Sequence, residues 1–243
     1  MLAQGDLITR YAVADRTVPR LRVNFISSLD GAATHDGLSG GLNNDDDKLV
    51  FDTLRLLSDV IVVGAGTVRG EGYGGIRLDP ADAAWRTARG LPAQLPVAIV
   101  SSRLDIDPGH AVFTEALVRP LVVTHAASSA KRRRDLAEVA DILICGEDAV
   151  DPRRMVDALA ARGLSQVLCE GGPHLFGALI EADCVDELCL TISPVLEAGG
   201  AGRIARSGTA ATRRMALLQV LTAGDMLFLR YGRREESEEA EET

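Results

Sequence analysis

The stretch that decides the fold is L-C-E-G-G-P-H-L, residues 168–175. It closes an apolar run of strand type with an acid, Glu170, and two glycines. Pro173 then stands where the first turn of a helix accepts proline. In open α/β folds such a strand-to-helix junction lies at the carboxyl end of the sheet, where ligands bind. Glu170 could therefore position a substrate or share a proton there; the alternatives are a surface carboxylate or a helix cap.

Short β-branched runs alternate with helical patterns on both sides of this junction. The runs predict strands at 21–27, 60–63, 96–100, 121–124, 142–144, 166–169, 187–192, 215–221 and 226–231. Helices are expected at 44–57, 129–139, 152–162 and 173–182, and residues 70–95 are expected to form a long functional loop with one short helix. This order predicts a single three-layer α/β domain. Its mainly parallel mixed sheet has helices on both faces and a C-terminal antiparallel hairpin.

Composition sets the outer limits of the domain. The chain is 47% hydrophobic but only 4% aromatic, so aliphatic side chains must build the core. Six glutamates in residues 235–243 account for most of the net charge of −9, and such a run is typical of a disordered tail. The expected division is an N-terminal extension (1–19), one folded domain (20–234) and the acidic tail (235–243). The rest of the chain has an ordinary charge balance, so no nucleic-acid partner is expected.

The cysteines and the N-terminus bear on which kinds of site and which cellular location to expect. None of the four cysteines forms a C-x-x-C pair, so neither a metal site nor a redox motif is expected. The first twenty residues hold no apolar leader and no stretch has the length of a membrane span. A cytoplasmic protein is the expectation.

Two further stretches carry chemistry-bearing residues. V-V-G-A-G-T-V-R-G, residues 62–70, runs from a buried strand into glycines and a hydroxyl, where exposed N–H groups can hold phosphate oxygens. Its spacing is not that of the dinucleotide fingerprint, and taken alone it is more often a plain turn. N-F-I-S-S-L-D-G, residues 24–31, ends in Asp30 and Gly31, which alone indicate a turn.

Taken together and in order, these stretches resemble the reductase domain of the bacterial riboflavin-biosynthesis deaminase-reductase, the RibD C-terminal family. The matching segments are S-L-D-G at 28–31, S-D-V-I-V-V-G-A-G-T at 58–67 and E-G-G-P-H-L at 170–175. A fourth runs from V-D-E-L at 185–188 to S-P-V-L at 193–196. The resemblance spans residues 20–231 and implies a dihydrofolate-reductase-like fold.

The resemblance implies that NADPH lies across the carboxyl edge of the sheet. The residues matched to cofactor contacts are Gly64, Gly66, Thr67, Glu71, Ser102, Arg103, Gly171, Gly172, Pro173, His174, Leu175 and Phe176. Ser102 and Arg103 are assigned to the 2′-phosphate, which an arginine binds by charge-assisted hydrogen bonds. The family has an aspartate where this chain has Glu71, and Gly72-Tyr73 replaces the usual acid-proline pair.

For the substrate, the resemblance assigns Ser39 and Arg55 to a ribose-phosphate group and Arg77 to a second phosphate contact. Glu170 matches the acid that contacts substrate, and Asp30 is expected near the nicotinamide. The implied reaction is NADPH-dependent reduction of the ribosylamino group of 5-amino-6-(5-phosphoribosylamino)uracil to the ribitylamino product in riboflavin biosynthesis. The proton is expected from Glu170, Asp30 or water. A homodimer is expected, with residues 187–192 as a candidate edge strand.

Two alternatives remain open at the level of sequence. The H-x-E and P-C-x-x-C signature of a zinc deaminase is missing, so the chain is a stand-alone reductase or a member with another substrate. A dihydrofolate-reductase-type pterin reductase shares fold and cofactor. A non-catalytic nucleotide-binding protein on the same scaffold is the other alternative, because fold alone does not determine function.

Overall fold

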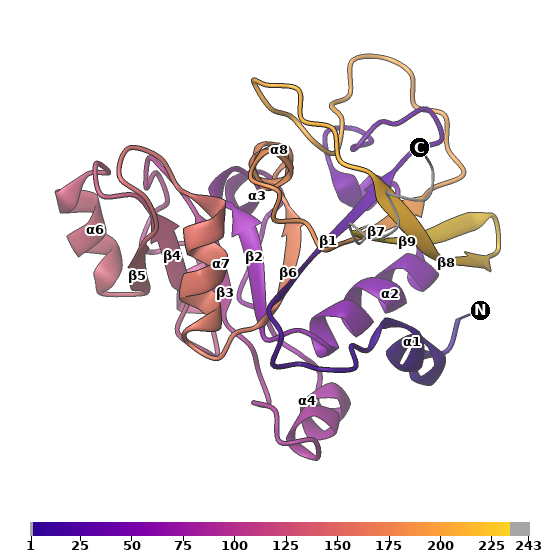
Figure 1. Cartoon of the computed structure of the whole chain (residues 1–243), viewed down its shortest axis with the longest axis horizontal. Helices are drawn as coiled ribbons and strands as arrows, with labels where there is room; N and C mark the ends of the chain where they lie inside the picture. Colours follow the sequence, from indigo (N-terminus) through magenta and orange to yellow (C-terminus); the bar gives the residue numbers. More distant parts are fainter. Residues whose placement is uncertain (1, 234–243) are drawn as a thin grey trace, which may run out of the picture.

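The computed structural model describes residues 2–233 and is built on one nine-stranded sheet (Figure 1). The predicted acidic tail, 235–243, lies outside the described residues. The strands are β1 Arg20–Ser27, β2 Val60–Gly64, β3 Val97–Val100, β4 Leu121–Thr124, β5 Asp141–Ile144, β6 Gln166–Gly171, β7 Glu187–Ile192, β8 Met215–Ala223 and β9 Met226–Arg233. Their order across the sheet is β5-β4-β3-β2-β6-β1-β7-β9-β8.

Pairing is parallel from β5 to β7, and β9 is antiparallel to both of its neighbours, β7 and β8. The predicted mixed sheet and terminal hairpin are therefore confirmed. Parallel pairing places the carboxyl ends of β2, β3, β6 and β1 on one edge, the upper edge in Figure 1. β7 lies between β1 and β9, so the expectation that it supplies a sheet edge is wrong.

Eight α-helices are described in residues 2–233. They are α1 Gln4–Tyr11, α2 Asp45–Leu56, α3 Ala65–Gly70, α4 Pro80–Thr87, α5 Ala111–Thr114, α6 Ala130–Ala137, α7 Pro152–Ala160 and α8 Pro173–Glu181, with a 3₁₀ turn, η1, at Ser39–Gly41. Local chemistry explains how four of these helices start: the side chains of Asn44, Asp79, Ser129 and Asp151 each accept a backbone N–H of the helix they cap. No bilayer-spanning helix, by length and hydropathy, is found in the described part of the chain.

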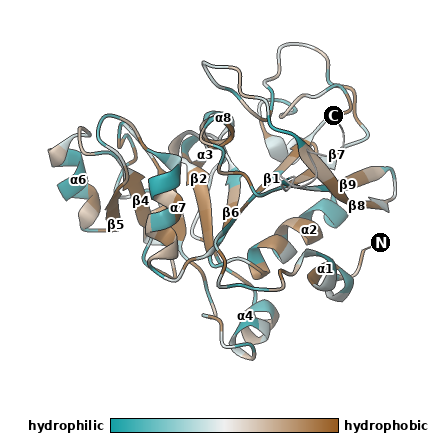
Figure 2. Cartoon of the chain, in the orientation of Figure 1, coloured by the Kyte–Doolittle hydropathy of each residue, from teal (hydrophilic) through white to brown (hydrophobic). Residues whose placement is uncertain are grey.

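Alternating strand residues feed two cores, one on each face of the sheet. Ile61 and Val63 of β2 pack with α1, α2 and α3 on one face, and Val60 and Val62 pack with α7 and α8 on the other. In Figure 2 the central strands are hydrophobic, and α6 and α7 carry hydrophilic segments. Helices thus cover both faces, as predicted.

The N-terminal extension contains the largest structural element that the sequence analysis omits. Residues of α1 belong to the main core, since Leu7 and Tyr11 are each 1% exposed. The backbone carbonyl of Tyr11 accepts a hydrogen bond from Arg22 on β1, and that of Arg10 accepts one from Arg230 on β9. The short helices α3 and α5 were also not predicted, because each is too brief to show a periodic pattern.

Candidate active site

Two adjoining cavities open at the carboxyl edge of the sheet. The first, the α2 cavity, has a volume of about 510 Å³. It is lined by α2, by β1 and the connection from β1 to α2, and by the end of β6. The second, the β3 cavity, has a volume of about 740 Å³ and lies along α3, the end of β3 and the start of α8. Thr67, Glu71, Gly172 and Pro173 line both. The two cavities therefore meet at the glycine-rich ends of β2 and β6.

The junction between the cavities depends on close backbone contact. β2 pairs with β6, and a register shift after Val62 sets Val63 opposite Gly171. Gly172, the residue before α8, has φ +98°, and a side-chain carbon there would lie 3.4 Å from the Cα of Gly64. Only glycine combines this φ with this approach at low cost. The backbone amides of His174 and Leu175, in the first turn of α8, have no intrahelical acceptor, and both residues line the β3 cavity.

Glu170 is held in a buried cluster at the inner wall of the α2 cavity. Its carboxylate accepts two hydrogen bonds from Arg55, at 2.6 and 2.7 Å, and one from the Tyr73 hydroxyl. The Glu170 side chain is 1% exposed. Burial, followed by the negative charge of Glu170, raises the pKa of Tyr73 well above its usual value. Burial opposes the charge on Arg55, but the neighbouring Glu170 dominates and raises the pKa of that guanidinium. The Arg55 guanidinium therefore stays charged.

One face of α2 also lines the α2 cavity. Asp47, Phe51 and Arg55 follow each other at four-residue spacing and all line the α2 cavity, while Val50 and Leu54 between them are buried in the core. The Arg55 guanidinium lies over the Phe51 ring, 4.3 Å from its centroid. The wall thus presents an acid, an aromatic ring and a cation in sequence.

Lys48 adds a second cation to this wall and pairs with Asp52 one turn later. Burial raises the pKa of Asp47, and a hydrogen bond with Thr191 partly offsets that effect. Across the cavity the Ser39 hydroxyl donates to Glu71 at 2.8 Å and so connects η1 to the end of α3.

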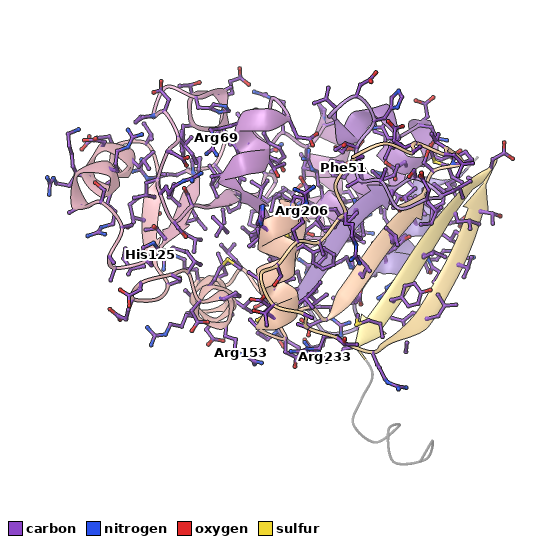
Figure 3. The ribbon with its side chains drawn as sticks, turned by 90° about the horizontal axis from the view of Figure 1, so that it is seen from above. Phe51, Arg69, His125, Arg153, Arg206 and Arg233 are labelled. Carbon is purple, nitrogen blue, oxygen red and sulfur yellow. The ribbon has the colours of Figure 1, made fainter. Side chains whose placement is uncertain are left out.

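Arginines occupy the outer end of the β3 cavity. Arg69 on α3 pairs with Asp105 at 2.8 Å, and Arg103 reaches the same carboxylate at 3.4 Å. Both arginines and Ser102 line the cavity. Figure 3 looks onto this edge of the sheet, with Arg69 toward the β3–β5 side and Phe51 toward the β7–β9 side. Both cavities therefore carry cations: Arg69 and Arg103 line the β3 cavity, and Lys48 and Arg55 line the α2 cavity beside Phe51.

Comparison with known proteins identifies the family of this chain. Residues 19–229 match the model of the RibD C-terminal domain. The chain belongs to the RibD C-terminal domain family. It is 28% identical over 185 residues to a 2,5-diamino-6-ribosylamino-4(3H)-pyrimidinone 5′-phosphate reductase of Archaeoglobus fulgidus, covering 74% of this chain and 83% of that one.

Two other proteins show how much of the chain is similar in sequence and in structure. The chain is 26% identical over 183 residues to the riboflavin biosynthesis protein RibD of Mycobacterium tuberculosis, covering 75% of this chain but 44% of that protein. A solved pyrimidine reductase-like protein from Corynebacterium diphtheriae superposes with a TM-score of 0.86 at 25% identity, covering 97% of this chain and 100% of that one. The predicted family and fold are confirmed.

Most residues that the sequence matched to this family lie together. The α2 cavity takes in Ser39, Arg55, Thr67, Glu71, Glu170, Gly171, Gly172 and Pro173. The β3 cavity takes in Gly64, Gly66, Thr67, Glu71, Ser102, Arg103, Gly172, Pro173, His174 and Leu175. Of these, Ser39, Arg55, Glu170 and Gly171 line only the α2 cavity, and Gly64, Gly66, Ser102, Arg103, His174 and Leu175 line only the β3 cavity. Their individual roles stay predictions.

Three predicted site residues lie elsewhere. Asp30 lines neither cavity: its carboxylate accepts hydrogen bonds from the Ser28 hydroxyl and from the backbone amides of Ala198 and Glu197. These bonds, that of Ser28 first, lower the pKa of Asp30 to about 2. An acid so fully bonded and ionised is unsuited to donate a proton, so Asp30 is a loop anchor.

Arg77 and Phe176 also fall outside both cavities. Arg77 is an exposed residue between buried Ile76 and Leu78, and it is not among the residues that line the α2 cavity. Phe176 is 4% exposed and stacks on Phe25, with ring centroids 4.9 Å apart. It faces the sheet because α8 rotates its side chains by about 100° per residue, which turns Phe176 away from the surface that His174 occupies.

Asp47, Arg69 and Tyr73 also line the cavities, although none of them is among the predicted site residues. A signal for Asp47 was present in its four-residue spacing before Phe51 and Arg55. Arg69 follows directly on the glycine stretch and could have been included with it. Tyr73 carried no usable signal, since it reaches Glu170 from a loop 97 residues away in sequence.

Proposed function

We propose that this chain is an NADPH-dependent reductase of a 5′-phosphorylated ribosylaminopyrimidine, converting the ribosylamino group to a ribitylamino group in riboflavin biosynthesis. The observation that carries the proposal is the meeting of the two cavities at Thr67, Glu71, Gly172 and Pro173. A ligand in one cavity is thereby brought against a ligand in the other. A protein that bound a nucleotide alone would not need the polar α2 cavity beside it.

The β3 cavity fits a nicotinamide dinucleotide. Gly64 and Gly172 approach so closely that a side chain at either would fill the cradle between them, and the first turn of α8 offers free amides to a pyrophosphate. Arg103, Ser102 and Arg69 fit the added charge of a 2′-phosphate, which supports NADPH over NADH. When bound, the reduced nicotinamide supplies a hydride.

The residues of the α2 cavity orient the other reactant. Opening of the ribose ring gives an imine at the first sugar carbon; that carbon accepts the hydride and the nitrogen takes up a proton. Glu170 accepts three hydrogen bonds as a buried carboxylate, which suits it to hold a substrate hydroxyl or amine in place. Arg55 and Lys48 both line this cavity, and the Nη1 group of Arg55 makes no hydrogen bond to any described residue, so these two are the proposed phosphate contacts. Orientation of the two reactants is the main contribution of the protein.

Two forms of the pyrimidine meet this description. One is 5-amino-6-(5-phosphoribosylamino)uracil, which the family resemblance implies. The other is the 2,5-diamino-pyrimidinone phosphate named for the Archaeoglobus relative, which differs at C2, where an amino group replaces the oxo group. Both carry the ribosylamino group that is reduced.

The test is loss of reduced-nicotinamide absorbance with each pyrimidine and with dihydrofolate, under NADPH or NADH. We expect turnover of a phosphorylated ribosylaminopyrimidine with NADPH and little or none of dihydrofolate. Turnover of dihydrofolate alone would replace this proposal with a pterin reductase. Binding of NADPH without turnover of any of the three would favour the non-catalytic alternative.

We also propose a homodimer. β8 is the outermost strand of the sheet, and its Leu217, Leu218 and Val220 are each about half exposed. Sedimentation velocity should give twice the mass of the chain, and a monomer at micromolar concentration would contradict the proposal.

A further inference from the structure

Four acids line the α2 cavity, and three of them are already engaged: Glu170 by Arg55 and Tyr73, Asp52 by Lys48, and Glu71 by Ser39. The fourth is Asp47. No described residue places a cation within ion-pair distance of it, and its side chain has a hydrogen bond with the hydroxyl of Thr191. Asp47 therefore has acceptor capacity left for a ligand.

The surroundings of Asp47 make that capacity significant. Thr191, on β7, is 2% exposed, and burial raises the pKa of Asp47 because the charged form loses hydration. A carboxylate in such a place gains most from N–H donors that replace the lost water. Asp47 also stands one helical turn before Phe51 on the same face of α2, so a flat ring that reaches Phe51 brings one edge to Asp47.

We propose that Asp47 determines which pyrimidine this site takes, because its carboxylate pairs with a ring N–H and an adjacent exocyclic amino group. The preferred substrate is then the 2-amino-4-oxo form rather than the uracil. This inference rests on the proposed function and narrows it to one of two substrate forms.

The chemistry of the two rings carries the discrimination. In the 2-amino-4-oxo ring, the N3–H and the 2-amino group are adjacent donors at the spacing of the two carboxylate oxygens, so both bonds form together. In the uracil, carbonyl oxygens flank N3–H on both sides. One carboxylate oxygen then faces a carbonyl oxygen. Both atoms are acceptors that carry negative charge, so they repel each other. Sites built around such donor–acceptor pairs discriminate strongly against the analogue that lacks a donor.

The experiment compares kcat/KM for the two phosphorylated pyrimidines, with NADPH, in the wild type and in Asp47→Asn. The wild type should prefer the 2-amino form by about tenfold or more. Asn can accept from N3–H and donate to the C2 carbonyl, so Asp47→Asn should lower kcat/KM for the 2-amino form about tenfold and leave or raise that for the uracil. Asp47→Asn should thus abolish or invert the preference.

Asp46→Asn is the matched control. It removes the same charge from the same turn of α2, but Asp46 accepts a backbone N–H from Leu2, outside the cavity. Its melting temperature and that of Asp47→Asn should agree, and its substrate preference should equal that of the wild type. Equal turnover of the two pyrimidines by the wild type, or a preference unchanged in Asp47→Asn, would overturn the inference.

The proposed function can fail separately. If neither pyrimidine is reduced, that function is wrong, and Asp47 is then tested by equilibrium binding of the two pyrimidines without cofactor. Tighter binding of the 2-amino form that is lost in Asp47→Asn still supports the inference, and equal dissociation constants overturn it.

Discussion

Arg55 links α2 to Glu170 at the end of β6 through a single guanidinium, and both residues line the α2 cavity. Nε and Nη2 bind Glu170, while Nη1 makes no hydrogen bond to a described residue. This geometry explains why arginine suits the position: its planar fork binds a carboxylate with one edge and leaves further donors for an anion. Lysine has one point charge and cannot do both.

Arg55→Ala should therefore affect stability as well as turnover. Removing the guanidinium leaves Glu170 buried and without its cation, which costs about 3–5 kcal/mol of unfolding free energy in comparable buried pairs. We expect a lower midpoint in urea and a fall in kcat/KM for the phosphorylated substrate. Arg55→Lys should recover part of the stability and little of the turnover.

A thermodynamic cycle of two protein variants and two substrates distinguishes a phosphate contact of Arg55 from its effect on stability. Wild type and Arg55→Lys are assayed with phosphorylated and dephosphorylated substrate. If Arg55 binds the phosphate, loss of the phosphate should cost Arg55→Lys less than it costs the wild type. Fully additive losses would mean that the two groups do not touch.

Arg103 is a more exposed residue with a narrower role. Its side chain is 81% exposed and reaches Asp105 at 3.4 Å, so it contributes little to folding. Arg103→Ala should raise KM for NADPH about tenfold and leave KM for NADH nearly unchanged, because only NADPH carries the 2′-phosphate. Steady-state kinetics with both cofactors measures this. Equal losses for the two cofactors would place the 2′-phosphate site elsewhere.

At the scale of elements, two strand-to-helix junctions create the site. β2 enters α3 and β6 enters α8 side by side, and the contact between Gly64 and Gly172 allows the two junctions to approach. A glycine at φ +98° before Pro173 also ends β6 sharply and directs the first turn of α8 at the cavities.

Gly172→Ala should therefore weaken both folding and cofactor binding. The strained φ costs on the order of 1 kcal/mol, and the added carbon meets Gly64 at 3.4 Å. We expect a lower melting temperature and a several-fold weaker dissociation constant for NADPH, measured by fluorescence titration.

Gly163→Ala is the control for backbone strain. Gly163 also has positive φ, +76°, but nothing lies within 4 Å of an added carbon, and it lines neither cavity. It should lose stability without losing NADPH affinity. An equal loss of affinity in both variants would show that general destabilisation explains the effect of Gly172→Ala.

At the scale of the whole molecule, Glu187 joins distant parts of the chain at the edge opposite the cavities. Its fully buried carboxylate pairs with Arg20 and Arg22 on β1 and with Arg230 on β9. The same Arg22 and Arg230 bind the end of α1. One acid thus ties three strands and the N-terminal segment together.

This cluster should control acid stability. Burial alone would raise the pKa of Glu187, but hydrogen bonding to Arg230 and the charges of Arg22 and Arg230 lower it to about 2, from an ordinary value of 4.5. Because the folded pKa is the lower one, the stabilisation is present above about pH 4.5 and is lost as the pH falls toward 2. The amount is roughly 3 kcal/mol, measured by urea unfolding across that range.

Glu187→Gln should remove most of this pH dependence and lower stability at neutral pH, since three arginines then lack their counter-charge. Glu147→Gln, which changes a carboxylate that is 78% exposed, should leave both unchanged. An acid unfolding curve that is the same in Glu187→Gln and wild type would refute the role of the cluster.

The sequence by itself determined the elements, their order and the family. Strand periodicity, helix caps at Asn44 and Asp151, and the glycine-proline junction at 171–173 all depend on neighbours a few residues away. These local signals placed all nine strands and four of the helices. The family resemblance carried by the ordered motifs grouped Ser39, Arg55 and Glu170 as one candidate site.

Only the tertiary structure decided what each side chain faces. Arg55 meets Glu170 across 115 residues and Tyr73 meets it across 97, because crossover connections bring β6 between β2 and β1. The same packing turns Phe176 into the core, ties Asp30 to a later loop and adds Asp47 to the cavity wall. Such contacts depend on the order of strands in the sheet and on helix rotation, which a local pattern does not encode.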